Sequence, residues 1–111
     1  MTQPNSNVVN VTLTTDVAGQ RFIGYTGTYA TAAATALGVS NLSGKSGQQL
    51  GVQINGIVEV LAGGAITVGA AVKVGTDGKV VAQGGTGTIV GRAFTASNGD
   101  GESILIHLIP N

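Results

Sequence analysis

A series of short strand-like runs, separated by glycine-containing turns, restricts the fold more than any other feature of the sequence. The runs are rich in valine, isoleucine and threonine, and 19 of the 111 residues are glycine. Such runs favour β-strands, and the glycine clusters between them favour turns. The pattern predicts strands over Val8–Thr14, Gln20–Tyr25, Gln49–Leu61, Ala71–Val74, Lys79–Gln83, Ile89–Ala96 and Ser103–Ile109. We therefore expect an all-β protein, and its length suits a single domain.

Two segments carry more specific local signals. Asp77 and Gly78 lie between the valine-rich runs Val72–Val74 and Lys79–Val81, and both residues tolerate the positive φ that a tight hairpin turn requires. The alanine-rich run Ala30–Leu37 contains two threonines and is short, which disfavours a helix. We expect a hairpin at the first segment, and a loop or an irregular strand at the second.

The last predicted strand is apolar on both of its faces. Ile104, Ile106 and Leu108 alternate on one face, and Leu105 and Ile109 lie on the other. A strand of this kind is usually covered on both sides. Either a neighbouring subunit covers Leu105 and Ile109, or these side chains close the ends of a barrel within one chain.

Charged side chains are scarce. Lysine, arginine, aspartate and glutamate make up 9% of the chain, and the net charge is zero, whereas charged residues make up about 25% of an ordinary soluble domain. Because the chain has no basic stripe, nucleic acid and anionic membranes are poor partners. A neutral surface with few charges favours association with other protein surfaces.

The spacing of polar residues does not match a catalytic, cofactor or metal site. Gly44-Lys45-Ser46 resembles the end of a phosphate-binding loop, but Val39 stands where that motif needs glycine. The chain has one histidine, His107, and no cysteine, so one chain cannot build a metal site from several such residues. The acidic residues lie apart and mostly in turn-like sequence, where nothing indicates a tuned acid or base. We expect neither enzymatic activity nor a bound cofactor.

The first residues, Met1–Asn7, are polar and uncharged. They lack the basic start and the apolar run of a secretory signal, and no apolar stretch is long enough to span a membrane. We expect a protein made in the cytoplasm, with these residues forming a mobile arm.

An ordered set of motifs covers most of the chain. It includes the sequence GVQINGIVEV at 51–60, AITVGAAVKV at 65–74, DGKV at 77–80, IVGRA at 89–93 and ILIHL at 104–108. Over roughly residues 20–109 the order of these motifs resembles that of the capsid decoration (cement) proteins of tailed bacteriophages.

The resemblance implies a compact β-barrel or β-tulip-like fold without catalytic or ligand-binding residues. It also implies a protein that is made in the host cytoplasm and assembles with itself, often as a trimer, on the outer capsid surface of the virion. There it bridges neighbouring major capsid proteins of the expanded head. Family members commonly use an N-terminal segment to engage the capsid. On this basis, residues 1–15 form an extended N-terminal arm, and residues 16–111 form the barrel.

Two sets of site residues follow from these expectations. The arm is expected to contact the capsid by adding a strand to an exposed sheet edge, through Val8, Val9, Val11 and Leu13. The alternative is that this strand pairs within its own barrel. The expected subunit interface consists of Leu105, His107 and Ile109. The alternative function is a fibre or adhesin module of a virion, which would bind a host or surface ligand.

Overall fold

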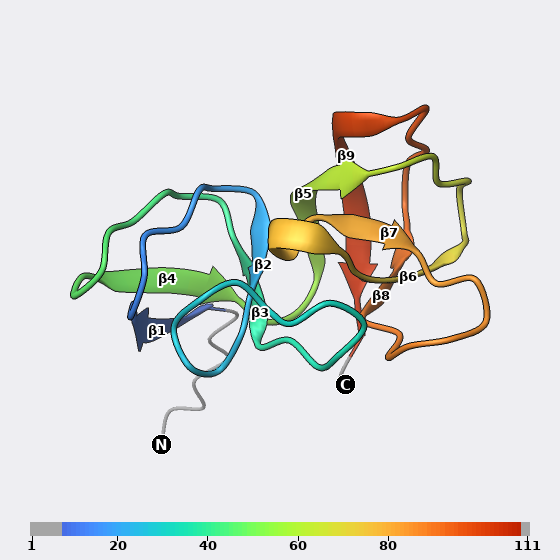
Figure 1. Cartoon of the computed structure of the whole chain (residues 1–111). Helices are drawn as coiled ribbons and strands as arrows, with labels where there is room; N and C mark the ends of the chain where they lie inside the picture. Colours follow the sequence, from blue (N-terminus) through green and yellow to red (C-terminus); the bar gives the residue numbers. More distant parts are fainter. Residues whose placement is uncertain (1–7, 110–111) are drawn as a thin grey trace, which may run out of the picture.

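Within residues 8–109, which the computed structural model describes, the chain forms nine β-strands and one short 3₁₀ turn (Figure 1). The strands are β1 (Val8–Thr12), β2 (Arg21–Ile23), β3 (Gly38–Ser40), β4 (Gln49–Gln53), β5 (Ile57–Gly63), β6 (Ala71–Val74), β7 (Val80–Ala82), β8 (Gly91–Ala93) and β9 (Asp100–Leu108), with the turn η1 (Thr76–Gly78) between β6 and β7. The predicted all-β architecture is confirmed. Residues 1–7, expected to form a mobile arm, lie outside the described residues.

The strands form two sheets that lie next to each other (Figure 1). The first is an open antiparallel sheet with the strand order β1-β4-β3-β2. The second is a closed barrel with the order β5-β7-β6-β8-β9. In the barrel, β5 and β7 are parallel and meet through the pair Ala62–Val80. The predicted barrel is therefore present, and the open sheet is added to it.

A core inside the barrel also holds the open sheet. The long antiparallel ladder between β5 and β9 turns alternate side chains inward, and those that are buried are Val58, Val60, Ala62, Ile104, Ile106 and Leu108. Phe22 of β2 and Val39 of β3 belong to the same core. The two sheets are thus joined by shared apolar packing.

The other face of the open sheet covers a second, smaller core. Its buried members are Leu13, Val17, Ile23, Leu50 and Val52, with Val9 and Val11 packed against them. Because successive side chains of a strand point to opposite faces, Phe22 faces the barrel while Ile23 faces the smaller core. The open sheet is therefore apolar on both faces over β2.

The β6–β7 hairpin has the turn that its sequence predicts. Asp77 and Gly78 both have positive φ, at 55° and 74°. The turn also packs against β2, because a Cβ atom on Gly78 would lie only 2.7 Å from the carbonyl oxygen of Phe22. In addition, Nη1 of Arg21 donates a hydrogen bond to the carbonyl of Asp77 at 3.1 Å. The turn is thus a second connection between the barrel and the sheet.

Two strand predictions need correction. The predicted strand Gln49–Leu61 is two strands, β4 and β5, because Gly56 adopts a φ of 86° and interrupts the extended chain. β3 is not among the predicted strands, since its three residues are too few to show alternation. The preceding run, Ala30–Leu37, is irregular as expected, and Ala33 joins it to the barrel by donating its N–H to the carbonyl of Val74 at 2.9 Å.

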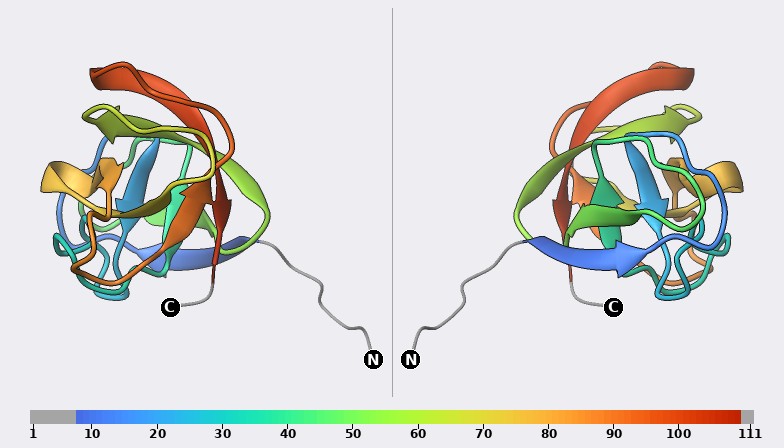
Figure 2. Two further views of the ribbon diagram at one scale, coloured as in Figure 1. Left: turned by 90° about the vertical axis from the view of Figure 1, so that its right-hand side faces the viewer. Right: turned by 90° about the vertical axis from the view of Figure 1, so that its left-hand side faces the viewer.

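β1 contradicts the expectation of a free N-terminal arm. It pairs antiparallel with β4 over five residue pairs, from Val8–Gln53 to Thr12–Gln49, and Figure 2 shows it along the lower margin of the sheet. Leu13, which follows it, is only 1% exposed. Main-chain pairing and burial thus hold the strand within its own domain, which is the alternative stated above. A division of the chain at residue 15 does not separate β1 from the rest of the fold.

Candidate functional site

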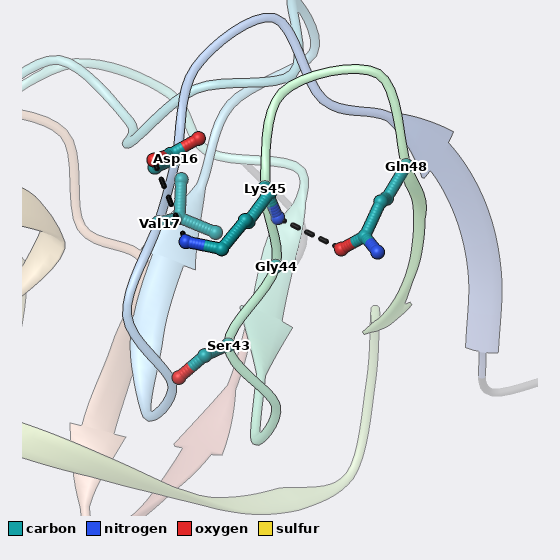
Figure 3. A pocket seen from close by; sticks show the side chains of 6 residues that line it. All are labelled: Asp16, Val17, Ser43, Gly44, Lys45 and Gln48. Carbon is teal, nitrogen blue, oxygen red and sulfur yellow. Dashed lines mark hydrogen bonds and ion pairs between the residues drawn. The ribbon is translucent and has the colours of Figure 1, made fainter.

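The loop that contains the Gly44-Lys45-Ser46 sequence lines a shallow hollow of about 310 Å³, together with Asp16, Val17, Ser43 and Gln48 (Figure 3). The backbone N–H of Lys45 donates to Oε1 of Gln48 at 2.9 Å, and the N–H of Ser46 donates to Oδ1 of Asp16 at 2.9 Å. A phosphate-binding loop needs such N–H groups to be free and needs no carboxylate beside them. This loop is therefore closed by its own side chains and is unsuited to binding phosphate.

The ionisable side chains do not form a reactive cluster. Lys79 and Asp100 make an ion pair at 3.0 Å, and Glu59 accepts a hydrogen bond from Ser103 at 2.8 Å. Within residues 8–109, no group of three histidine, cysteine, aspartate or glutamate residues is placed to hold a metal ion. The same residues contain no helix that is long and apolar enough to cross a membrane. Two surfaces of the described residues bring exposed apolar side chains together with other residues, and these are the remaining candidate sites.

The first apolar surface, which we call the barrel face, lies on the outside of β5, β9 and β8. Its members are Ile57 and Glu59 of β5, Leu105 and His107 of β9, and Arg92 and Phe94 at β8. His107 pairs with both Ile57 and Arg92, and paired residues of neighbouring strands point to the same side of a sheet. Two residues before His107 on the same face of β9, Leu105 pairs with Glu59 of β5. The carbonyl of Leu105 accepts a hydrogen bond from the N–H of Phe94 at 2.8 Å.

The barrel face combines an apolar centre with two charges at its sides. Ile57, Leu105 and Phe94 are 46%, 36% and 56% exposed, which is a high exposure for large apolar side chains that lie side by side. Arg92 is held by a hydrogen bond from Nη1 to the carbonyl of Gly69 at 3.1 Å. Exposed apolar side chains with charged groups beside them suit contact with another protein.

The predicted interface residues are only partly brought together. Leu105 and His107 lie on the barrel face and point outward. Ile109 is half-buried, and its N–H donates to the carbonyl of Val90 at 3.0 Å, so it lies at the end of the barrel. Sequence reasoning missed Ile57 and Phe94. Ile57 could have been found from alternation, because it stands next to the inward-facing Val58.

The second apolar surface, which we call the sheet hollow, lies on the open sheet beside β1. It measures about 330 Å³ and is lined by Val8, Val39, Asn41, Leu42, Gly51 and Gln53. Val8 and Leu42 are 52% and 65% exposed. A Cβ atom on Gly51 would lie 3.3 Å from Cγ1 of Val8, so the absence of a side chain at Gly51 keeps the hollow open.

The four predicted arm residues are divided between the two faces of the sheet. Val8 lines the sheet hollow. Val9 and Val11 point the other way and pack on the smaller core, in which Leu13 is buried. Burial makes Leu13 unavailable to a capsid pocket, so the expectation for this residue was wrong. Of the four, Val8 is the one with most of its side chain open to a partner.

Comparison with known proteins identifies the family. The fold is similar to that of the N base of the head fiber gp8.5 of bacteriophage phi29, with a TM-score of 0.79, 19% sequence identity and 92% of each chain covered. At this identity the likeness shows a shared fold alone, and no curated protein sequence matches the chain significantly. The family model described as phage cement protein matches residues 2–108, which confirms the resemblance seen in the sequence. The chain therefore belongs to the phage cement protein family, whose role is structural and associated with the phage capsid.

Proposed function

We propose that the chain is a decoration protein that binds the outer surface of the expanded phage head and bridges neighbouring major capsid proteins. The observation that carries this proposal is the family match over residues 2–108. The barrel face and the sheet hollow support it, because they lie on different sheets of one domain. A domain with two such surfaces can contact another copy of the chain through one and a capsid protein through the other, so the assembly reaches several capsid proteins.

Stabilisation of a head by this route needs binding energy spread over several contacts rather than a chemical reaction. Packed DNA pushes the capsid subunits apart, so a clamp must hold several of them together. Contacts that are weak individually raise the avidity by about 10²–10⁴ when the geometry lets them form together. The charge-poor surface of the chain fits contacts of this kind.

The barrel face is the proposed contact between copies of the chain, in a homotrimer. Leu105 and His107 lie in the middle strand of this face, and Ile109 lies at its margin. Glu59 and Arg92 lie on the two outer strands, so Glu59 of one copy can meet Arg92 of the next. A head-to-tail contact of this type closes into a ring when the rotation between copies allows it.

Leu105→Asp tests this contact. The substitution should convert the assembly into monomers, because it would place an unpaired carboxylate in an apolar interface. The β-rich circular dichroism spectrum should be retained, since Leu105 points away from the core. Light scattering after size-exclusion chromatography gives the mass, and Leu42→Asp on the other surface is the matched control. A Leu105→Asp protein that assembles like the natural one would disprove the interface.

Co-sedimentation with expanded heads that lack the protein tests the decoration role. The purified chain should saturate at a fixed, simple ratio of bound copies to capsid subunits. That ratio also identifies the symmetry position that the protein occupies. If the chain does not bind heads of the phage that encodes it, the decoration role is wrong.

A second candidate function is the base of a virion fibre or an adhesin module that binds a host or surface ligand. The observation that favours it is the fold shared with the N base of the phi29 head fiber over 92% of each chain. An adhesin should bind host cells directly, whereas a decoration protein should bind heads and leave host cells free. Pull-down of the purified chain with host cells and with heads separates the two functions.

A further inference from the structure

The outer edge of β1 is available to another strand. β1 is the end strand of the open sheet, and the N–H of Leu13, just beyond it, donates to the carbonyl of Gln48 at 2.8 Å. Hydrogen-bonded residues alternate along an antiparallel ladder, so Val8 and Asn10 direct their backbone N–H and C=O groups away from β4. Among residues 8–109, these outward groups have no backbone partner.

The opposite end of the same sheet is covered. β2 is bridged by Tyr29, which pairs with Ile23, and the carbonyl of Phe22 accepts a hydrogen bond from the N–H of Ala30 at 3.0 Å. The loop around Gly27 also covers the chain just beyond β1, because its carbonyl accepts the N–H of Thr14 at 2.9 Å. Within residues 8–109, the open stretch therefore covers Val8 to about Thr12.

β1 also lacks the features that protect exposed strand edges. Natural edge strands usually carry lysine, proline, a bulge or a covering segment. The sequence Val-Val-Asn-Val-Thr contains no charge and no proline, and its five residue pairs with β4 run without a bulge. An edge of this kind favours pairing with another extended chain.

The sheet hollow gives this edge an apolar neighbour. Val8 is at once an edge residue and a wall of the hollow, and it is 52% exposed. In a strand added beside β1, the side chain opposite Val8 would lie on the same face, within contact distance. A large apolar side chain at that place would cover Val8 and the part of the hollow next to β1, towards Gly51.

We propose that the free edge of β1 binds an extended, uncharged segment of the major capsid protein as a further strand, with a large apolar side chain over Val8 and the part of the sheet hollow next to β1. The inference rests on the proposed decoration function and names the surface and the chemistry of its partner. A second copy of this chain fits the edge less well. Antiparallel pairing of two β1 strands about Asn10 places Thr12 of the second copy opposite Val8, and its small polar side chain leaves the hollow uncovered.

Asn10→Pro tests the proposal directly. Proline removes the outward N–H of residue 10 and blocks the edge, yet it leaves the bonds to β4 intact, because proline is tolerated on an edge strand where the N–H faces solvent. Asn10→Ala keeps the N–H and is the matched control. Head binding of Asn10→Pro should weaken about tenfold or more, whereas that of Asn10→Ala should stay within about threefold.

A second variant tests the edge without proline, so the proposal stays testable if Asn10→Pro misfolds. Val8→Lys places a charge beside the edge without changing the backbone, and Thr86→Lys adds the same charge to an exposed loop of the barrel. We expect weaker head binding for the first variant alone. Hydrogen–deuterium exchange of residues 8–12 in the natural protein should slow when heads are added, because the outward amides gain partners.

The outcomes separate this inference from the proposed function. If the natural protein and both β1 variants bind heads equally, and exchange at residues 8–12 is unchanged, decoration stands and the edge proposal is wrong. If Asn10→Pro changes the oligomeric mass without heads, the edge joins copies of this chain, and the capsid segment is the wrong partner. If the natural protein does not bind heads, the decoration role and this inference both fail.

Discussion

The open sheet and the barrel differ in whether their strand edges are paired. The barrel closes on itself through β5 and β7, so each of its strands has a neighbour on both sides. The open sheet ends at β2, whose edge is covered, and at β1, whose edge is open over Val8–Thr12. A closed barrel offers partners only its side chains, while an open edge also offers backbone hydrogen bonds. One domain thus contains two different kinds of association surface.

The two regions nevertheless share a core, and the largest predicted effect tests how far they act as one unit. Phe22 belongs to the sheet but packs inside the barrel core at 1% exposure. Phe22→Ala should lower the free energy of unfolding by about 3–5 kcal/mol, because it leaves a cavity where the sheets meet. Urea unfolding followed by NMR amide signals from both sheets should show one common transition.

The matched control for Phe22→Ala is Phe94→Ala on the barrel face, where the side chain is 56% exposed. When both variants are made in the Leu105→Asp protein, which is expected to be monomeric, this change should alter the free energy of unfolding by about 0.5 kcal/mol or less. Separate midpoints for the sheet and the barrel would show that the shared core does not couple them.

The next largest effect concerns the turn that connects the barrel to β2. Gly78 has a φ of 74°, and a Cβ atom there would lie 2.7 Å from the carbonyl oxygen of Phe22. Gly78→Ala should therefore cost about 1–3 kcal/mol of unfolding free energy. Gly64→Ala is the control, because a Cβ at Gly64 meets no atom within 4 Å. Equal thermal stability of the two variants would mean that the turn does not hold the regions together.

The smallest predicted effect lies in the shallow hollow beside the Gly44-Lys45-Ser46 loop. Asp16 accepts the N–H of Ser46 at 2.9 Å and lies 3.9 Å from the ammonium group of Lys45, with both charged side chains largely exposed. Asp16→Asn keeps an acceptor oxygen and should change the free energy of unfolding by about 0.5 kcal/mol or less, because solvent screens the ion pair. Asp16→Ala also removes the acceptor and should cost about 1 kcal/mol. Chemical denaturation measures both variants. If they lose the same unfolding free energy, the charge of Asp16 and not its acceptor oxygen provides the stabilisation.

Much of the barrel could be predicted from local sequence. Asp77-Gly78 indicates its own turn through the positive φ that both residues tolerate. The alternation of Ile104, Ile106 and Leu108 against Leu105 correctly separates the inside of β9 from its outside. These features depend on neighbouring residues, so a single sequence contains them.

The open sheet was less predictable because its defining contacts are distant in sequence. β1 pairs with β4, some forty residues later, and alternation in β1 does not reveal its partner. β3 has three residues and lies between two other strands, where its own pattern is too short to detect. The sheet hollow depends on Val8, Leu42 and Gly51 meeting in space, which no local motif indicates.

The heat resistance of heads with and without the protein shows whether the chain bridges and stabilises the capsid. Expanded heads that lack it should be mixed with increasing amounts of the purified chain and heated, and capsid disruption should be followed by light scattering. If the chain bridges capsid proteins, the disruption temperature should rise until the binding sites are filled and then stay constant. Saturated heads that break at the same temperature as undecorated heads would contradict the claim that the chain bridges and stabilises the capsid.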